Sequence, residues 1–330
     1  MTLSHRVAFT GKQAVELQSN TLAAPAAGEV LVETAWSLMS TGTENIVFNR
    51  NFAPGTHWDN WVKYPFFPGY CAVGTIRAVG EGVAATRVGE NVAIRAGHAA
   101  HHLIKADEAY PIPAGIPLRE ATWFGLAKIA FMGARRAEYR AGDDVLVIGA
   151  GPIGQMSLRW AAASGAGRIT TIDLEPARLA LATAGGASQV LSSKPEESKD
   201  QLKAHHDGQL PRVVLDTTGH APVFASALTT VRDFGRLILI GDTGKPQEQH
   251  LTSDVITRGL SVVGAHDCHN DAEWNNSTIT RLFFRLVGSG RFPLAGLVSD
   301  VFKPADCVAA YAAANARRGT TMGIVFDWTK

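Results

Sequence analysis

Residues 145–154 have the sequence Val-Leu-Val-Ile-Gly-Ala-Gly-Pro-Ile-Gly, and this stretch decides the fold of the chain. Its four apolar residues predict a buried strand, and its three glycines have the spacing G-x-G-x-x-G. We expect a helix over residues 155–163 and a second strand over residues 168–172, which an acid, Asp173, follows directly. This order of strand, glycine turn, helix, strand and acid is typical of a dinucleotide-binding βαβ unit.

Each glycine of this unit has a separate expected task. Gly149 allows a tight turn from strand to helix, Gly151 lets the backbone approach a pyrophosphate, and Gly154 lets the helix pack closely on the strand. The phosphates would lie at the helix N-terminus, where free N–H groups and the helix dipole favour anions. The Asp173 carboxylate would accept hydrogen bonds from an adenosine ribose and repel a 2′-phosphate, and neighbouring Glu175 adds to that repulsion. The predicted cofactor is therefore NAD.

Further cofactor contacts are expected where other strands of the same sheet end. Residues 212–216, 235–241 and 260–264 are apolar runs that predict strands, and ligands of doubly wound sheets bind at the carboxyl ends of the strands. Arg178 is expected near the adenine. The complete predicted set is Gly149, Gly151, Pro152, Ile153, Gly154, Asp173, Leu174, Arg178, Thr217, Thr218, Gly241 and Asp242.

The composition narrows the class of protein. A length of 330 residues predicts two domains, and 46% hydrophobic residues suffice for packed cores. A net charge of +1 gives no field that would attract nucleic acid or a membrane surface, so the expected partner is a small-molecule substrate. The sequence shows neither a membrane-spanning run nor a signal peptide, and its three cysteines are far apart. These features favour a cytoplasmic location.

The order of predicted elements indicates an α/β fold with an inserted domain. The first 118 or so residues are mostly β, with strands expected over residues 30–36, 72–79, 91–95 and 102–105. Strands and helices then alternate, which predicts a doubly wound parallel Rossmann sheet. A last strand is expected over residues 323–328. We therefore expect a β-rich domain from residues 1–120 and 266–330, with the dinucleotide-binding domain, residues 121–265, inserted.

The chain resembles the medium-chain dehydrogenase/reductase superfamily, which includes the zinc-type alcohol dehydrogenases, over essentially its whole length. The resemblance rests on the fingerprint and on the motifs Gly28–Glu33, Pro68-Gly69, Gly74–Val83, Arg87–Ala93 and Asp173–Leu179. It implies that the β-rich domain is GroES-like and catalytic, and that homodimers form through edge strands, here residues 260–264. The motifs Ser40–Glu44 and Val325–Trp328 resemble the subgroup that contains the hydroxyethyl-bacteriochlorophyllide dehydrogenase.

The same resemblance implies a protein without zinc. Many members hold a catalytic zinc at three positions that match Thr41, Tyr70 and Phe124 in this chain, and these side chains are not useful zinc ligands. The four-cysteine structural zinc loop is also missing. His98, His101 and His102 could in principle form another metal site, although three such residues on or near a strand are expected to point to both of its faces. We predict no metal ligands.

Without zinc, a protein side chain must manage the proton on the substrate oxygen. Tyr70 occupies the place of a lost zinc-binding histidine, Thr43 matches a hydroxyl that relays protons in zinc enzymes, and Glu44 would orient their turn. Lys128 matches the nicotinamide side of the site, in an otherwise apolar segment. Tyr70, Thr43 and Lys128 each have a structural alternative. Tyr70 could be a packed aromatic, Thr43 a satisfied turn hydroxyl, and Lys128 a lysine that extends to the surface.

Three further catalytic candidates are less sharply defined. His266 and Asp267 follow the predicted strand 260–264 at its carboxyl end, where ligands bind. His101 lies on or near the strand expected at residues 102–105. Histidines in loops are common, so these three residues could also be structural. The predicted catalytic set is Lys128, Tyr70, Thr43, His266, Asp267 and His101.

The sequence leaves three functions open. The leading hypothesis is a zinc-independent, NAD-dependent dehydrogenase that interconverts a secondary alcohol and its ketone, on a sugar, cyclitol, hydroxy acid or tetrapyrrole alcohol. A quinone or enoyl reductase is the second, although its zinc-free relatives tend to prefer NADPH, against which Asp173 argues. The third is a protein that senses NAD without catalysis. Reduction of NAD that depends on a substrate would separate the enzymes from the sensor.

Overall fold

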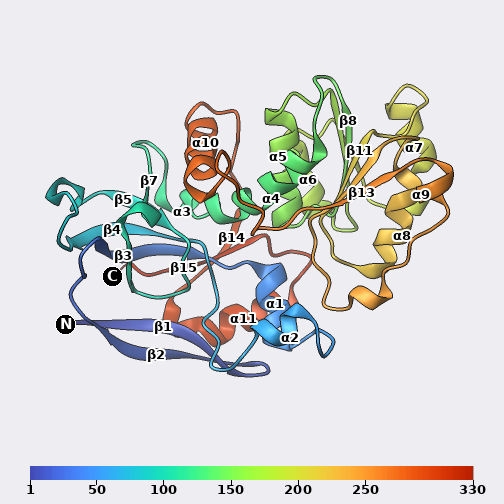
Figure 1. Cartoon of the computed structure of the whole chain (residues 1–330). Helices are drawn as coiled ribbons and strands as arrows, with labels where there is room; N and C mark the ends of the chain where they lie inside the picture. Colours follow the sequence, from blue (N-terminus) through green and yellow to red (C-terminus); the bar gives the residue numbers. More distant parts are fainter. Residues whose placement is uncertain (330) are drawn as a thin grey trace. The chain divides into compact units, whose positions relative to one another are not determined.

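The computed structural model describes residues 1–329, which divide into two compact units (Figure 1). The first unit contains residues 1–125, residues 276–288 and the chain from residue 295 onward. The second contains residues 126–275 and 289–294. The domain boundaries that the sequence predicted, after residues 120 and 265, stay a prediction.

The second unit is built on a six-stranded, wholly parallel sheet. The strand order is β10-β9-β8-β11-β12-β13, so the chain starts in the middle of the sheet and winds outward in both directions. The strands are β8 (Asp144–Ile148), β9 (Arg168–Ile172), β10 (Gln189–Leu191), β11 (Val213–Asp216), β12 (Arg236–Leu239) and β13 (Ser261–Gly264). This arrangement confirms the predicted doubly wound Rossmann sheet.

Helices connect these strands, as parallel pairing requires. The connecting helices are α5 (Pro152–Ala163), α6 (Pro176–Ala184), α7 (Lys199–His205), α8 (Ala221–Thr230) and α9 (Asp254–Thr257), and α4 (Phe124–Ala137) precedes the first strand, β8. Apolar residues of the central strands, such as Leu146, Val214 and Leu237, are fully buried in one core cluster with Phe224 and Leu228 of α8. Burial of strands under helices explains why these strands are continuous apolar runs in the sequence.

The first unit is rich in β-structure and draws on both ends of the chain. Its main sheet has the order β14-β15-β3-β4-β5-β7, with β6 paired to β3, and β1 pairs with β2 as a separate hairpin. The strands are β1 (Thr2–Gly11), β2 (Ala14–Leu22), β3 (Glu29–Leu38), β4 (Ala72–Val79), β5 (Asn91–Ile94), β6 (His101–Lys105), β7 (Tyr110–Pro111), β14 (Val298–Phe302) and β15 (Gly323–Asp327). The β-rich domain that the sequence predicted is confirmed.

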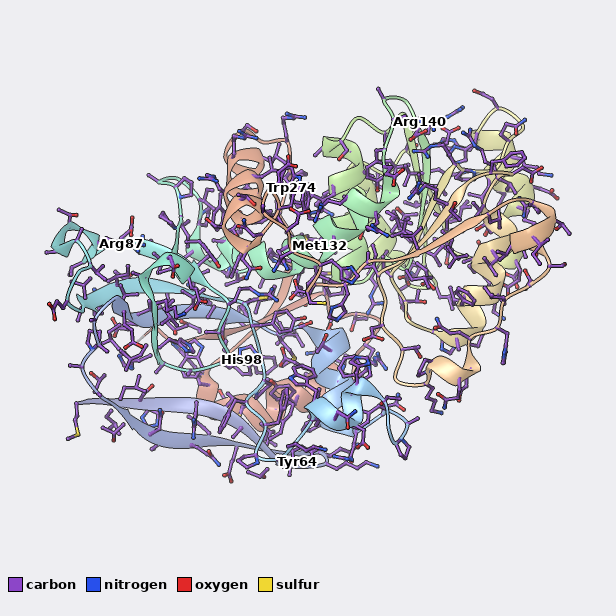
Figure 2. The ribbon with its side chains drawn as sticks, in the orientation of Figure 1. Tyr64, Arg87, His98, Met132, Arg140 and Trp274 are labelled. Atoms are coloured by element: carbon purple, nitrogen blue, oxygen red, sulfur yellow. The ribbon has the colours of Figure 1, made fainter. Side chains whose placement is uncertain are left out.

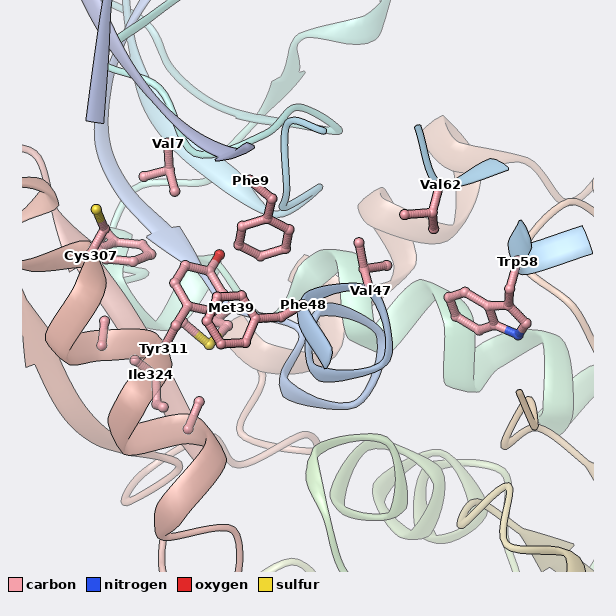
Figure 3. Close-up of a cluster of buried hydrophobic side chains, with 13 residues drawn as sticks. Val7, Phe9, Met39, Val47, Phe48, Trp58, Val62, Cys307, Tyr311 and Ile324 are labelled. Carbon is pink, nitrogen blue, oxygen red and sulfur yellow. The ribbon is translucent and has the colours of Figure 1, made fainter. Parts of the chain in front are cut away.

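Helices of the first unit pack around an aromatic core (Figure 3). The helices that contribute to this core are α1 (Thr41–Asn49), α2 (His57–Trp61) and α11 (Cys307–Ala316), and the unit also contains α3 (Leu118–Ala121) and α10 (Asn276–Gly288). Phe9 of β1 lies edge-on to Tyr311 of α11 at 4.8 Å between ring centroids, and Phe48 of α1 stacks on Tyr311 at 5.4 Å. This core fixes α1, and with it the turn that carries Ser40, against the C-terminal helix.

Two local differences from the sequence analysis bear on the site. The segment after Ser40, expected as a turn, is the first turn of helix α1. Helix α5 begins at Pro152, three residues before the expected start, because proline suits the first helical position after Gly151. In the described part of the chain, no helix combines the length and hydrophobicity that crossing a membrane requires.

Candidate active site

The glycine turn after β8 has the geometry that its residue types predict. Gly149 has a φ of 90°, which favours glycine, and its N–H donates to the Ile172 carbonyl at 2.8 Å. A Cβ on Gly154 would lie 1.8 Å from the Gly149 carbonyl oxygen, so only glycine lets α5 approach the strand this closely. The Thr217 hydroxyl donates to the carbonyls of Ile148 and Gly149 at 2.9 and 3.0 Å. The turn is therefore held from both neighbouring strands.

Gly151 leaves the space that a pyrophosphate would need. A Cβ built on it would have Nη1 of Arg178, at 3.8 Å, as its nearest neighbour, so the backbone is open here. Helix α5, which has 12 residues, starts at the next residue, and Pro152 and Ile153 are partly exposed at its first turn. The N-terminus of such a helix favours an anion. These residues fit the diphosphate of a nicotinamide dinucleotide.

Asp173 is fixed directly beside the glycine turn. Its Oδ2 accepts from the Ala150 N–H at 2.6 Å and its Oδ1 from the Glu175 N–H at 2.9 Å, with the side chain 10% exposed. Nη1 of Arg178 lies 3.8 Å from Oδ2 of Asp173. The neighbouring Leu174 is 63% exposed, which is unusual for a leucine and suits an apolar contact with a base. Both carboxylate oxygens are therefore held by backbone N–H groups beside the glycine turn.

The ends of β11 and β12 lie close together at the same edge of the sheet. A Cβ on Gly241 would lie 2.2 Å from the Gly219 nitrogen, so glycine is required there. Asp216 is buried at the end of β11 and accepts from the N–H and hydroxyl of Thr218 at 2.9 and 2.7 Å. Burial raises the pKa of Asp216. Asp242, which follows Gly241, is exposed. All the predicted cofactor residues lie after the carboxyl ends of β8, β9, β11 and β12.

Two predicted catalytic residues of the second unit form an ion pair. Nζ of Lys128, on α4, lies 2.7 Å from Oδ1 of Asp267, and Nζ also donates to the Asp267 carbonyl oxygen. Lys128 is 2% exposed, whereas the Asp267 side chain is 30% exposed. The lysine therefore does not extend to the surface, which was the alternative that the sequence left open. The third candidate, His266, is exposed, and its Nδ1 lies 3.0 Å from Sγ of Cys268.

In the first unit, three hydroxyl groups form a chain. The Tyr70 hydroxyl donates to Oγ of Ser40 and lies 3.4 Å from Oγ1 of Thr43. The Arg95 guanidinium lies over the Tyr70 ring, 4.7 Å from its centroid. Burial raises the pKa of Tyr70, and the charge of the Cys71 thiolate would add to that effect, while the hydrogen bonds with Ser40 and Thr43 oppose it. The Tyr70 hydroxyl thus stays protonated at neutral pH and can serve as a hydrogen-bond donor.

Glu44 organises the turn that holds this hydroxyl chain. It is 1% exposed, and its Oε1 accepts from the Ser40 N–H at 2.7 Å. Its Oε2 accepts from the Tyr311 hydroxyl at 2.5 Å and lies 3.1 Å from Nε2 of His98. Nδ1 of His98 lies 2.8 Å from Oγ of Ser37. The residue His98 is labelled in Figure 2. Glu44 therefore orients Ser40 through the backbone, as the sequence analysis expected of its turn.

The residues at the expected zinc positions make other contacts. Thr41 begins α1, the Tyr70 hydroxyl is engaged with Ser40, and Phe124 is fully buried. Cys71, beside Tyr70, packs against Gly125, where an added Cβ would lie 2.3 Å from Sγ. Across residues 1–329, no three His, Cys, Asp or Glu residues are grouped so that they could hold a metal ion. The donor set of this site does not fit a catalytic zinc.

The three histidines near β6 have separate environments. His98 precedes the strand and bonds to Glu44 and Ser37, as described above. His101 and His102 are consecutive on β6, so they point to opposite faces of the sheet. Burial lowers the pKa of His102 to about 4, helped by the neighbouring charges of His101 and His98. His101 stays a candidate only by its position in the first unit.

Sequence reasoning missed residues that only the fold brings to the site. Ser40 had a signal, because it directly precedes the threonine at an expected zinc position. Tyr311 had none, since it lies 267 residues from Glu44, which it contacts. Arg95 contacts Tyr70 from a neighbouring segment of the β-rich unit. Each belongs to the surroundings of a predicted residue rather than to a recognisable motif.

Comparison with known proteins agrees with these observations. Residues 152–282 match the family model of zinc-binding dehydrogenases. The chain is 24% identical over 318 residues to the uncharacterized zinc-type alcohol dehydrogenase-like protein YphC of Escherichia coli (strain K12), which covers 83% of this chain and 90% of that protein. It is 26% identical over 211 residues to the sorbitol dehydrogenase of Bacillus subtilis (strain 168), which covers 54% of this chain and 60% of that enzyme.

Solved structures show the same fold. A short chain alcohol dehydrogenase from Escherichia coli CFT073, complexed with NADH, has a TM-score of 0.83 at 18% identity and covers 99% of this chain and 100% of that chain. A protein from Sinorhizobium meliloti 1021 bound to NADP has a TM-score of 0.83 at 15% identity, with the same coverage. At these low identities the solved structures establish the fold of the chain alone, and the match to zinc-binding dehydrogenases is confined to residues 152–282.

Proposed function

We propose that the protein is an NAD(H)-dependent oxidoreductase that interconverts a secondary alcohol and its ketone without zinc. One observation carries the proposal. At the position where the family resemblance implies a zinc-binding histidine, the chain has Tyr70, and its hydroxyl is part of a chain with Ser40 and Thr43. A protonated, positioned hydroxyl can stabilise charge on a carbonyl oxygen, which is the task of the metal in zinc-dependent relatives.

The second unit supports binding of NAD. When bound, the nicotinamide supplies or accepts the hydride. The open backbone at Gly151 and the start of α5 would hold the diphosphate, and Asp173 would accept from the ribose hydroxyls. The fixed negative charge of Asp173 favours NAD over NADP, because a 2′-phosphate would meet it at close range.

The first unit supports proton transfer through side chains. Since burial raises the pKa of Tyr70, its hydroxyl stays protonated at neutral pH, and in ketone reduction it would turn its one proton from Ser40 Oγ toward the substrate oxygen. Ser40 and Thr43 are the neighbours that could replace its proton. Glu44 holds Ser40 by a backbone hydrogen bond of 2.7 Å, so we assign it a positioning role.

The buried cation supports a hydroxylated or anionic substrate. Lys128 is almost fully buried and paired with Asp267. Ligand sites typically use a few such charged side chains to bind and orient a polar substrate. We propose that Lys128 binds the substrate oxygen or an anionic group, and that Asp267 keeps the ammonium oriented. A sugar, cyclitol or hydroxy acid would use such a pair. The motifs Ser40–Glu44 and Val325–Trp328 support a zinc-free subgroup that also contains a tetrapyrrole alcohol dehydrogenase.

A substrate screen with and without chelator tests this function. The purified protein is incubated with NAD and a panel of secondary alcohols, polyols and hydroxy acids, and NADH absorbance is followed. We expect substrate-dependent reduction of NAD, well under one zinc per chain by elemental analysis, and unchanged rates after prolonged chelator treatment. Stoichiometric zinc whose removal abolishes turnover would overturn the proposal.

The same screen addresses the two other functions. Oxidation of NADPH by quinones or enones, with no alcohol oxidised, would favour a quinone or enoyl reductase. NAD binding without turnover on any substrate would favour a sensing protein. We further propose a homodimer and a cytoplasmic location, the latter supported by three cysteines that form no disulfide.

A further inference from the structure

The second unit has a positively charged cavity that the proposed function does not use. It has a volume of about 810 Å³, within the range of ligand pockets. Six cationic side chains line it together with one carboxylate, that of Asp233. The cations are Arg140, Lys199, Lys203, Arg212, Arg232 and Arg258.

This cavity lies at the opposite edge of the sheet from the cofactor residues. Arg140, Arg212, Arg232 and Arg258 come from segments that precede β8, β11, β12 and β13, whereas the cofactor residues follow the carboxyl ends of the strands. In a parallel sheet all amino ends share one edge. Strands of four to five residues at about 3.3 Å per residue keep the two edges well apart. Figure 2 shows Arg140 close to the start of β8. The cavity is therefore a separate site.

Most of its positive charge is not neutralised by the protein. Arg212 pairs with Asp143, and Arg258 pairs with Asp233 at 2.8 Å and Asp254 at 3.3 Å. Within residues 1–329, no carboxylate lies at ion-pair distance from the other four cations, Arg140, Lys199, Lys203 and Arg232. The whole chain has a net charge of only +1, so this local excess does not follow from a generally basic composition.

Two of the four cations repel each other on one helix. Lys199 and Lys203 are four residues apart on α7, which places both on the same helix face. Like charges at this spacing destabilise a helix, and Asp200, three residues before Lys203 on the same helix, offsets only part of that repulsion. A bound anion would remove this repulsion. The arrangement is thus unfavourable for the protein alone and favourable with a polyanionic ligand.

An aromatic residue with a strained backbone conformation, Phe234, lines the same cavity. Phe234 is 84% exposed and has a φ of 58°, a conformation that bulky residues rarely adopt. Its ring lies against Gly259, where an added Cβ would be 2.8 Å from Cδ1 of Phe234. Backbone strain and exposure of a large apolar ring both cost stability, and such features gather at functional sites. An exposed ring beside cations is the arrangement that binds a nucleobase next to its phosphates.

We propose that this cavity binds a nucleoside polyphosphate. Arg140, Lys199, Lys203 and Arg232 bind the phosphates, and Phe234 stacks on the base. This site is distinct from the glycine-rich cofactor site and does not depend on the reaction that the protein catalyses.

Calorimetric titration with ATP tests the proposal, in protein saturated with NADH so that the cofactor site is filled. We expect one ATP per chain, bound more tightly than inorganic tripolyphosphate. The double variant Lys199→Glu/Lys203→Glu should weaken ATP binding about tenfold or more, since each exposed charge pair is worth up to about one kcal/mol and is reversed here. Phe234→Gly, which suits the positive φ, should weaken ATP about fivefold or more but leave tripolyphosphate unchanged.

The control carries the same change in charge elsewhere. Lys12→Glu/Lys105→Glu alters two exposed lysines of the first unit and should bind ATP like the wild type. NADH titration of every variant verifies that the second unit is folded, and its failure in the wild type would count against the proposed function alone. The proposal is overturned if the pocket and control variants bind ATP equally, if tripolyphosphate binds as tightly as ATP, or if a single-stranded oligonucleotide binds more tightly than either.

Discussion

The ammonium group of Lys128 lies 2.7 Å from the Asp267 carboxylate, and the two residues are unequally buried. The lysine is 2% exposed and the aspartate side chain 30%. Water reaches part of the carboxylate if the lysine is removed, although its Oδ1 is buried, whereas the ammonium stays almost out of reach of water if the aspartate side chain is removed. Loss of the aspartate carboxylate should therefore leave the more costly buried charge, even though the ammonium keeps the backbone carbonyl of residue 267 as an acceptor.

This asymmetry predicts different effects for the two residues. Asp267→Ala should lower the free energy of unfolding by about 3 kcal/mol, and Lys128→Met by about 1 kcal/mol, as measured from urea midpoints. Lys128→Met should nevertheless reduce turnover on the order of 10²-fold while NAD affinity changes little, because the substrate loses its cation. Lys245→Met, in an exposed pair with Glu248, serves as control and should leave both properties near wild type. Normal turnover of Lys128→Met would make the pair purely structural.

The hydroxyl chain predicts a specific loss at Tyr70. Tyr70→Phe removes the donor to Ser40 and should lower turnover about 10²-fold with little change in the melting temperature. Since burial raises the pKa of Tyr70, this loss should persist across the neutral pH range. Tyr64→Phe removes a hydroxyl that bonds only weakly, at 3.4 Å, to the Val47 carbonyl and should be nearly silent. Equal rates for the two variants would remove Tyr70 from the mechanism.

The position of Asp173 predicts cofactor preference. NAD should bind about tenfold more tightly than NADP or better, since the carboxylate repels a 2′-phosphate. Asp173→Ala should reduce that ratio and also weaken NAD, because the Ala150 N–H loses its acceptor. Glu175→Gln removes only the neighbouring charge and should have a small effect. Fluorescence titration with both cofactors measures these ratios, and a wild-type preference for NADP would contradict the assignment.

The sequence predicted the second unit far better than the first. The fingerprint around Gly149 is local, because strand, glycine spacing and acid lie within thirty or so residues, and strict backbone contacts allow few alternatives. The 2.8 Å bond from Gly149 to Ile172 and the close approach of Gly154 follow directly from residue types. Motifs of this kind can be recognised without knowledge of the tertiary structure.

The surroundings of Tyr70 could not be predicted in the same way. Glu44 meets Tyr311 across 267 residues, and only the packing of α11 on α1 brings them together. The helix α1 itself was missed, since Gly42 and β-branched threonines are weak helix formers and the helix depends on tertiary contacts. Lys128 was selected by the family resemblance and Asp267 by its position after a predicted strand. Neither argument predicted that the two side chains would be in contact.

The exposed end of the parallel sheet predicts a dimer. β13 is the last strand in the order and pairs only with β12 in the second unit, which leaves one edge open. Light scattering should give about twice the chain mass of 35.1 kDa. Val263→Lys on β13 should shift the protein toward monomers, whereas Val301→Lys on β14, the edge of the other sheet, should not. A wild-type monomer at micromolar concentration would refute this.

His102 predicts how stability depends on pH. Burial lowers its pKa from 6.5 to about 4, so the folded protein binds fewer protons than the unfolded chain between these values. Stability from this group is complete above about pH 6.5, is lost as the pH falls below that value, and the loss levels off near pH 4. A shift of this size corresponds to about 3 kcal/mol at most.

The variant His102→Gln isolates this contribution. It lacks the titrating group, so its urea midpoint should fall less between about pH 7.5 and about pH 5 than that of the wild type. His5→Gln replaces an exposed histidine of β1 and should follow the wild-type curve, because no buried charge is involved. Differences between variants cancel the titration of all other groups, including buried Asp216, whose raised pKa acts in the opposite direction. Parallel curves for His102→Gln and the wild type would show that His102 is hydrated enough to be protonated in the folded state.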